Sequence, residues 1–249
     1  MITSDVFLSQ RPSFSRAVCF SNEATPMLRK LIKCGVEPRV LYSGESPNVA
    51  WSFYHSLSNR SVCFQYSVLF NGMDVRCKSN CFQPLYWPCS RREMEAGVPW
   101  KERMMLCAVM SCKGRSMPNW ANWKSRYVQP FRNVRMKLQD WVDPFLRVDD
   151  LYETRLKAIE EYAGKAGFQL YGRGWDAAIR HWPRFKRLSF ANAPKIMYED
   201  KIIGLSKYKF VLCYENCIFP GYITEKIFDG LFGGGVPVYY GAPDIADYV

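Results

Sequence analysis

The sequence predicts an α/β protein made of two domains that face each other across a cleft. One observation is a βαβ pattern near the C-terminus: a strand at Tyr208–Tyr214, a helix at Ile223–Phe232 and a strand at Val236–Tyr240. Another is the continuous apolar run Met104–Met110, which is typical of a strand buried on both faces of a sheet. Finally, 249 residues are long for one compact α/β domain and comfortable for two small ones.

We place the domain boundary between residues 148 and 149. Residues 118–150 are rich in Trp, Pro and Arg with little periodicity, which favours an irregular connection. Helical spacing then restarts over Asp150–Ala163, where Asp149 or Asp150 is suited to cap the first turn and the glycines at 164 and 167 end the helix. A strand at Phe168–Tyr171 and a tight Gly-Arg-Gly turn follow it. Residues 1–148 therefore form one predicted domain and residues 149–249 the other.

In the first domain, the amphipathic stretch Met27–Cys34 predicts a short helix. Arg39–Tyr42 and Ser61–Leu69 predict strands, the first of which ends in a Gly-Glu-Ser-Pro turn.

Charge and composition limit the functional classes. The net charge of +11 favours an anionic partner, such as a nucleotide diphosphate, an acidic membrane surface or nucleic acid. There is no run of five or more Lys/Arg residues, which disfavours a nucleic-acid-binding tail. The ten cysteines form no C-x-x-C pair and there are only two histidines, so a zinc site is disfavoured and reduced thiols are favoured, with disulfides as the alternative in a luminal protein. We see no apolar run of membrane-spanning length and no export signal at the N-terminus.

The loop Glu215–Gly221 follows a predicted parallel strand and precedes a helix. Ligands of open parallel sheets bind beyond the carboxyl ends of the strands, and a helix N-terminus attracts phosphate. Lys226 in the first turn is suited to neutralise a diphosphate, Glu215 and Glu225 to accept hydrogen bonds from hydroxyl groups, and Tyr222 to cover a base or a ribose. The alternative is an ordinary capped helix with a solvated Glu–Lys pair.

The longer segment 208–243 reads YKFVLCYENCIFPGYITEKIFDGLFGGGVPVYYGAP. It closely resembles the donor-binding signature of the α-1,3/1,4-fucosyltransferases, glycosyltransferase family ten. The resemblance adds Asn216 and Thr224 to the expected donor-binding residues. Family members continue beyond this signature, so we expect the second domain to be incomplete at Val249.

Shorter similarities lie upstream. Arg39–Pro47 (RVLYSGESP) resembles the family's acceptor-side strand and turn, which puts Glu45 at the position of the general base. Tyr152–Arg155 (YETR) resembles the start of the donor half, and Arg155 matches an arginine that binds the donor phosphates. A turn carboxylate that bonds nearby N–H groups is the alternative for Glu45.

The resemblance implies a GT-B fold of two Rossmann-like halves, with the acceptor side in residues 1–148 and the donor side in 149–249. It implies an inverting enzyme that moves L-fucose from GDP-fucose to a glycan hydroxyl, with an α-1,3 linkage to GlcNAc. We expect no metal and no cofactor beyond the donor substrate, since the sequence has no D-x-D pair. The alternatives are another GT-B transferase and an inactive glycan- or nucleotide-binding homologue.

The expected partners are GDP-fucose and an oligosaccharide, such as a lipopolysaccharide glycan, and not nucleic acid. We expect a cytoplasmic protein with peripheral contact to the inner membrane through its basic surface. The alternative is the Golgi lumen, if an N-terminal anchor is missing from this chain.

Overall fold

The computed structural model describes residues 17–20, 37–46, 50–51, 54–55, 64–69, 79–84, 97–112, 138–139, 141–146, 148–181, 183–189 and 201–249. The chain divides into two compact units, Met1–Tyr86 and Trp87–Val249, called here unit 1 and unit 2. Within the described ranges, no helix has the length and apolar character needed to cross a bilayer.

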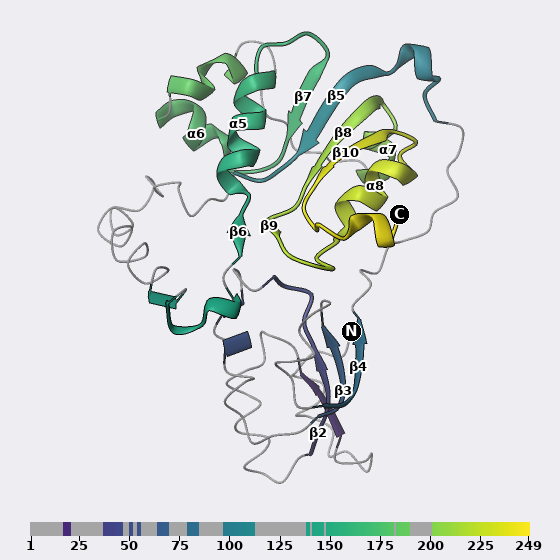
Figure 1. Ribbon diagram of the computed structural model, residues 1–249. Coiled ribbons are helices and arrows are strands. Elements are labelled where there is room, and N and C mark those ends of the chain that lie inside the picture. The colour runs from purple at the N-terminus through teal and green to yellow at the C-terminus, as the bar shows by residue number, and fades with distance from the viewer. Residues whose placement is uncertain are drawn as a thin grey trace, which may run out of the picture. The chain divides into compact units, whose positions relative to one another are not determined.

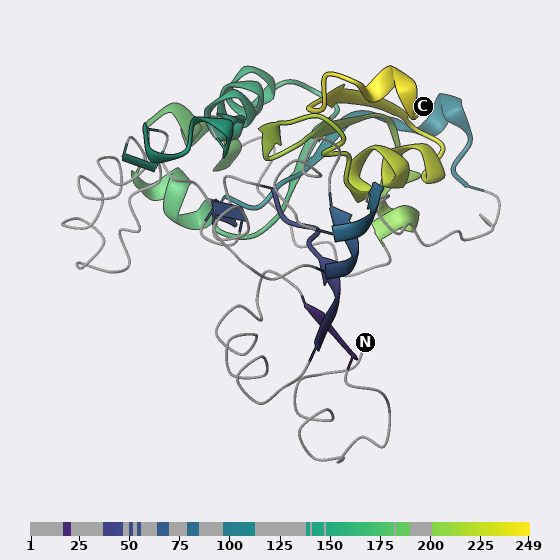
Figure 2. The ribbon, with the colours of Figure 1, turned by 60° about the horizontal axis from the view of Figure 1, so that its bottom comes forward.

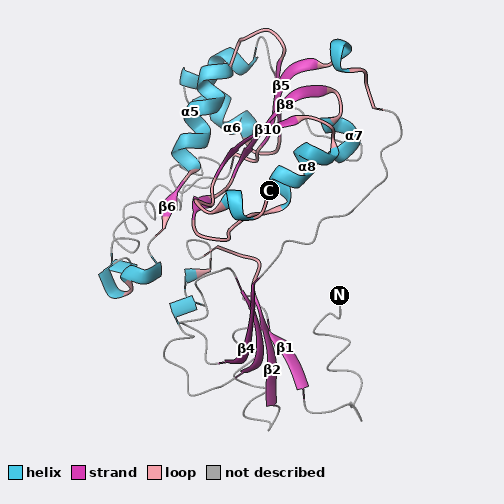
Figure 3. Cartoon of the chain, turned by 45° about the vertical axis from the view of Figure 1, so that its right-hand side comes forward, coloured by secondary structure: helices cyan, strands magenta, loops and turns pink. Residues whose placement is uncertain are grey.

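Unit 1 contains a four-stranded sheet in the order β1-β2-β3-β4 (Figure 3). Its strands are β1 (Ala17–Phe20), β2 (Glu37–Tyr42), β3 (Phe64–Leu69) and β4 (Ser79–Pro84). All three pairings are parallel. The structure confirms the two predicted strands and adds β1 and β4, whereas the helix predicted at Met27–Cys34 lies outside the described residues.

Unit 2 is built on a second four-stranded parallel sheet in the order β10-β8-β5-β7 (Figure 1). Its strands are β5 (Met104–Val109), β7 (Phe168–Tyr171), β8 (Tyr208–Tyr214) and β10 (Val236–Tyr240). The chain starts in the middle of this sheet at β5, adds β7 on one side, and then crosses to β8 and β10 on the other. The direction of winding therefore reverses between β5 and β8, which is the topological switch point of a doubly wound sheet.

Helices cover both faces of the unit 2 sheet (Figure 1). On one face, α5 (Tyr152–Tyr162), α6 (Trp175–His181) and η5 (Pro183–Ser189) enclose the main apolar core with side chains of β5, β7 and β8. On the other face lie α7 (Lys201–Leu205) and α8 (Glu225–Phe232). The end of the chain, with η6 (Ile245–Asp247), packs back against α8 through Ile245 and Tyr248 (Figure 2).

Smaller elements complete the description: η3 (Trp100–Glu102), η4 (Pro144–Leu146), and an antiparallel ribbon of β6 (Asp149–Asp150) with β9 (Cys217–Ile218). The glycines of the predicted Gly-Arg-Gly turn are required by close packing. A Cβ on Gly172 would lie 2.0 Å from the carbonyl oxygen of Met110, and one on Gly174 would lie 2.7 Å from that of Cys112.

The α/β class is as expected, but the boundary differs. The sequence places it between residues 148 and 149, whereas the compact units divide between Tyr86 and Trp87. The boundary lies earlier in the chain because β5 forms hydrogen bonds with β7 on one side and with β8 on the other. Strand β5 therefore belongs to the same sheet as the strands that follow it. An apolar run signals a buried strand but carries no information about which sheet it joins.

Candidate functional site

The candidate site of unit 2 begins at the carboxyl end of β8, next to the switch point. Glu215 and Asn216 follow this strand directly, and the loop after them leads through the short β9 to the N-terminus of α8. A strand carries its last side chains to the sheet edge, and the helix that follows turns its free N–H groups toward the same edge.

The β6–β9 ribbon brings a distant segment to this edge. Asp149 and Asp150 pair with Ile218 and Cys217, and the backbone N–H of Leu151 donates to the carbonyl of Asn216 at 3.0 Å. Helix α5 starts immediately after this contact. Its first turn is therefore held beside the loop that follows β8, although the two segments lie about sixty residues apart.

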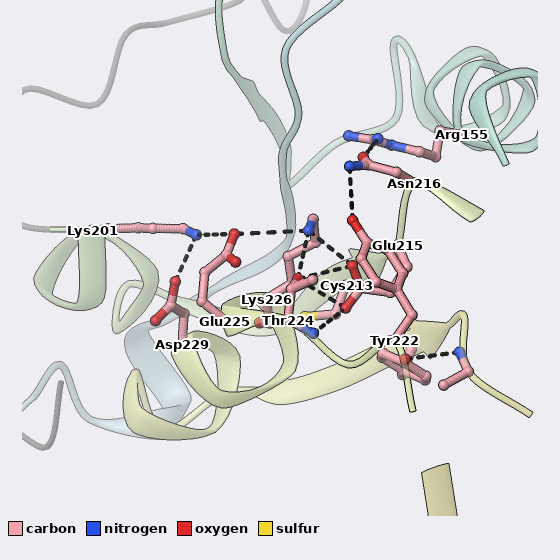
Figure 4. A network of polar contacts seen from close by, with 12 residues as sticks. Arg155, Lys201, Cys213, Glu215, Asn216, Tyr222, Thr224, Glu225, Lys226 and Asp229 are labelled. Carbon is pink, nitrogen blue, oxygen red and sulfur yellow. Dashed lines mark hydrogen bonds and ion pairs between the residues drawn. The ribbon is translucent and has the colours of Figure 1, made fainter. Parts of the chain in front are cut away.

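Arg155 projects from this first part of α5, and its Nη1 donates to Oδ1 of Asn216 at 2.6 Å (Figure 4). The guanidinium also lies 5.2 Å from the centre of the Tyr152 ring. The amide group of Asn216 donates in turn to the hydroxyl of Tyr222 at 3.2 Å. Sequence reasoning selected Arg155 and Asn216 separately, and the structure brings them together.

The Arg155 charge is buried but is not neutralised by an ion pair. Only 7% of the residue is exposed, and among the described residues no carboxylate lies within ion-pair distance of its guanidinium. Burial lowers the pKa of Arg155, against the opposing influence of groups that include Tyr152 and Glu215. Because a buried charge is costly without a counterion, this arrangement is suited to an anionic ligand.

A second charged group lies at the N-terminus of α8, where the buried carboxylate of Glu215 accepts hydrogen bonds from three donors (Figure 4). These are the backbone N–H of Thr224 at 2.8 Å, the Thr224 hydroxyl at 2.8–2.9 Å and Nζ of Lys226 at 2.9 Å. Thr224 has the extended backbone of an N-cap residue, but its hydroxyl is directed to Glu215 and not to the helix. Lys226 also donates to this hydroxyl at 2.6 Å.

The charges continue along the exposed side of α8. Oε1 of Glu225 lies 3.7 Å from Nζ of Lys226 and 4.0 Å from Nζ of Lys201, which also contacts Asp229 at 2.6 Å. Burial on its own would raise the pKa of Glu225, but Lys226 and Lys201, together with hydrogen bonds to the carboxylate, outweigh this effect, so the pKa is lowered. Glu225 therefore carries its negative charge at neutral pH and is available as a hydrogen-bond acceptor.

The seven predicted donor-binding residues divide into two groups. Arg155, Asn216, Glu225 and Lys226 surround the edge of the sheet, with side chains of Glu225 and Lys226 exposed by 35% and 18%. Glu215, Tyr222 and Thr224 are closed off, with 0%, 2% and 2% exposure. Neither Glu215 nor Tyr222 has exposed side-chain surface in this structure. The expected contacts of Glu215 with hydroxyl groups and of Tyr222 with a base or a ribose stay predictions.

Glu45, the predicted general base, lies in unit 1 at the bend that follows β2. Its backbone N–H donates to the hydroxyl of Ser43 at 3.3 Å, and its carbonyl accepts a hydrogen bond from the fully buried Tyr54 at 2.7 Å. These contacts fix the backbone of the turn, and the residue is partly exposed.

Sequence reasoning did not select Lys201, Asp229 or Gly241. Glu225 and Asp229 are one turn apart on α8, a spacing that indicates a shared face and a common cationic partner. No sequence signal identifies Lys201 as that partner. Gly241 lies against the Glu215 side chain, where a Cβ would be 2.5 Å from Cγ of Glu215.

Four cysteines of unit 2, Cys107, Cys112, Cys213 and Cys217, form no disulfide bond. The Cys213 thiol donates to the carbonyl of Lys226 at 3.2 Å. Burial raises the pKa of Cys112 and Cys213 to about 12 in each case. These thiols stay protonated at neutral pH and cannot act as nucleophiles.

Comparison with known proteins shows which family this chain is similar to. Residues 152–249 match the profile of "Glycosyltransferase family 10 (fucosyltransferase) C-term". The chain is 38% identical over 76 residues to an α-(1,4)-fucosyltransferase of Arabidopsis thaliana. The matched region covers 30% of this chain and 18% of that protein. It is 52% identical over 42 residues to the α-(1,3)-fucosyltransferase FucT of Helicobacter pylori, which is 17% of this chain and 9% of that protein.

A bovine GDP-fucose protein O-fucosyltransferase 3 is 53% identical over 45 residues, covering 18% of this chain and 9% of that protein. The chain thus spans less than a fifth of the length of these curated relatives in the matched regions. Among solved structures, an α1,3-fucosyltransferase with GDP aligns with 95% of this chain and 59% of its own, at a TM-score of 0.44 and 19% identity. The profile and the matching relatives show that residues 152–249 of this chain are similar to the C-terminal region of glycosyltransferase family 10, the fucosyltransferases.

Proposed function

We propose that the chain is a glycosyltransferase that moves L-fucose from GDP-fucose to a hydroxyl group of an acceptor glycan. The observation that carries this proposal is Arg155, a buried guanidinium without a carboxylate partner among the described residues, next to the α8 N-terminus with Lys226. The diphosphate of a nucleotide sugar supplies the missing negative charge. The family match of residues 152–249 and the relatives named for GDP-fucose support fucose as the transferred sugar.

In this proposal, Arg155 and Lys226 bind the diphosphate and stabilise the charge that develops as GDP leaves. Asn216 and Glu225 are placed to bond hydroxyl groups of the donor. The acceptor oxygen attacks the anomeric carbon of fucose from the face opposite GDP and loses its proton to Glu45. The bond between this carbon and the diphosphate oxygen breaks, which gives inversion without a covalent intermediate.

We further propose an α-1,3 linkage to GlcNAc, a GT-B arrangement of the two units, transfer without a metal, and a cytoplasmic location with contact to an acidic membrane. The profile matches residues 152–249, which contain all the expected donor-binding residues and exclude Glu45, so it supports the proposal for the donor and not the proposal for the acceptor. The identity of the acceptor is therefore determined by assays that compare a lipopolysaccharide glycan, an N-glycan and a protein side chain.

Isothermal titration calorimetry with GDP, UDP and ADP, each in the presence of EDTA, tests the proposal. We expect GDP to bind most tightly of the three. Incubation with GDP-fucose and a panel of acceptors carrying N-acetylglucosamine would then identify the product and its linkage by NMR. Equal affinity for the three nucleotides, or no binding by the folded chain, would remove the fucosyltransferase assignment for this chain.

A further inference from the structure

The Glu215 carboxylate is the most enclosed charged group of the site. It has 0% exposure, and it accepts from the Thr224 backbone, the Thr224 hydroxyl and the Lys226 ammonium. Gly241 leaves no room on one side, because even a methyl group there would lie 2.5 Å from Cγ of Glu215. The carboxylate is thus fixed in one position and has no surface through which a ligand could reach it.

The Lys226 ammonium is held by the same group. An ammonium has three N–H donors. One is directed to Glu215 at 2.9 Å and one to the Thr224 hydroxyl at 2.6 Å. Glu225 is farther, at 3.7 Å. Two donors therefore anchor the ammonium and the third remains for a ligand at the exposed side, where 18% of the side chain is accessible.

We propose that Glu215 is a positioning residue that acts through Lys226 and does not touch the nucleotide sugar. This inference rests on the proposed function, since the ligand that Lys226 receives is the diphosphate. Without Glu215, the four-carbon side chain of Lys226 would sample many rotamers, and ordering it again would oppose ligand binding.

Simple electrostatics predicts the opposite effect, which makes the proposal testable. A carboxylate near a diphosphate repels it, so removal of the Glu215 charge alone should tighten GDP binding. If Glu215 positions Lys226, the isosteric variant Glu215→Gln should bind GDP more weakly, by about tenfold. Tighter or unchanged binding by a folded Glu215→Gln protein overturns the proposal.

The first experiment is a double-mutant cycle on the full chain, with GDP affinity measured by calorimetry. Glu215→Gln, Lys226→Met and the double variant are compared with the unmodified protein. If Glu215 acts through Lys226, the loss caused by Glu215→Gln disappears in the Lys226→Met background. A loss of equal size in both backgrounds overturns the proposal. Glu161→Gln, an exposed carboxylate on α5, serves as the matched control and should leave GDP affinity unchanged.

A matched pair at Thr224 covers the case in which Glu215→Gln does not fold. Thr224→Ser keeps the hydroxyl between Glu215 and Lys226, whereas Thr224→Val removes it at nearly the same volume. We expect weaker GDP binding only for Thr224→Val, and equal affinities for the two variants would contradict the arrangement.

A second readout does not depend on nucleotide binding. Acetic anhydride acylates lysine amines that are free and accessible, and mass spectrometry locates the products. We expect slow acylation of Lys226 relative to the exposed Lys157, and several-fold faster acylation of Lys226 in Glu215→Gln or Thr224→Val. Unchanged acylation of Lys226 in those variants overturns the positioning role. If the unmodified chain binds no GDP, the proposed function fails, and the acylation rates still decide whether Glu215 holds Lys226.

Discussion

Arg155 and Lys226 meet the proposed ligand in different ways. Arg155 has a planar fork of donors, of which Nη1 alone donates to a side chain of the described residues, that of Asn216, and its charge is buried. Lys226 offers one remaining N–H on an ammonium that Glu215 and Thr224 already hold. The arginine is therefore suited to two phosphate oxygens and the lysine to one.

Replacing either cation should weaken diphosphate binding. For Arg155→Ala and for Lys226→Ala we expect a loss of about 1.5–3 kcal/mol in GDP affinity, because each removes a charged hydrogen bond from a partly desolvated site. Calorimetry with GDP and with guanosine measures the phosphate-dependent part, and Lys157→Ala is the surface control. Undiminished GDP affinity in both variants would show that these residues are not phosphate ligands.

Glu45 is expected to act on the acceptor and not on the donor. Glu45→Gln keeps the shape of the side chain but cannot take a proton, so the transfer rate should fall about 10²–10⁴-fold. GDP affinity should stay the same, since the proton that the base removes belongs to the acceptor. Both quantities would be measured on the same protein. A normal transfer rate would assign the base to another residue, and a joint loss of transfer and GDP binding would indicate a structural role for the turn.

At the level of elements, the position of α5 decides where Arg155 lies. The β6–β9 ribbon holds its start, where the Asp150 carboxylate accepts the N–H of Tyr152 at 2.7 Å. On its outer side, Glu153 binds Arg184 of η5 through both carboxylate oxygens, at 2.9 and 3.4 Å. This ion pair connects α5 to η5, the first and last helical segments on this face of the sheet.

The Glu153–Arg184 pair makes a pH-dependent contribution to stability. The hydrogen bond from Arg184 is the main cause that lowers the pKa of Glu153 below its ordinary 4.5. The folded state therefore binds this proton less readily than the unfolded chain, so the stabilisation is present at neutral pH and is lost as the pH falls through the lowered pKa. Both side chains are partly exposed to solvent, which limits the free energy that this ion pair contributes to stability.

We expect Glu153→Gln to reduce the free energy of unfolding by about 0.5 kcal/mol at pH 7. In acid below the lowered pKa, the variant and the unmodified protein should become equally stable. Urea unfolding at a series of pH values measures this. A difference that persists unchanged at acid pH would assign the loss to packing and not to the ion pair.

At the level of the whole molecule, the division of the chain follows from the sheet that β5 joins. Because β5 lies between β7 and β8, a unit that starts after it lacks the central strand of its own sheet. The exposed β5 neighbours would then lose their hydrogen-bond partners on the inner side.

We expect residues 87–249, expressed alone, to fold and to bind GDP with the affinity of the full chain. Residues 149–249, the domain that sequence reasoning predicts, should not fold into a cooperative unit. Circular dichroism, thermal unfolding and calorimetry with GDP compare the two fragments. Cooperative unfolding of residues 149–249 would show that β5 is dispensable and would restore the boundary at 148/149.

Local sequence patterns predicted most of the strands and helices of unit 2, because these elements depend on residues that are neighbours in the sequence. The strands Phe168–Tyr171, Tyr208–Tyr214 and Val236–Tyr240 have the predicted bounds, since apolar runs between turn residues define them. Helix α8 begins at Glu225, two residues after the prediction, because Thr224 takes the N-cap position. The short β9 lies inside a predicted loop, since two residues have no detectable period and pair only because β6 is opposite.

Sequence patterns alone predicted the α/β class, the resemblance to the fucosyltransferases and the residue types expected at a phosphate-binding helix N-terminus. Three features come from long-range contacts: the sheet that β5 joins, the hydrogen bond between Arg155 and Asn216, and the inward position of Glu215 against Thr224 and Lys226. The physical reason is that a signature records which side chains are present, whereas burial and partners depend on segments far apart in the chain. A carboxylate at the end of a strand therefore looks like a ligand in the sequence and is an internal support in the fold.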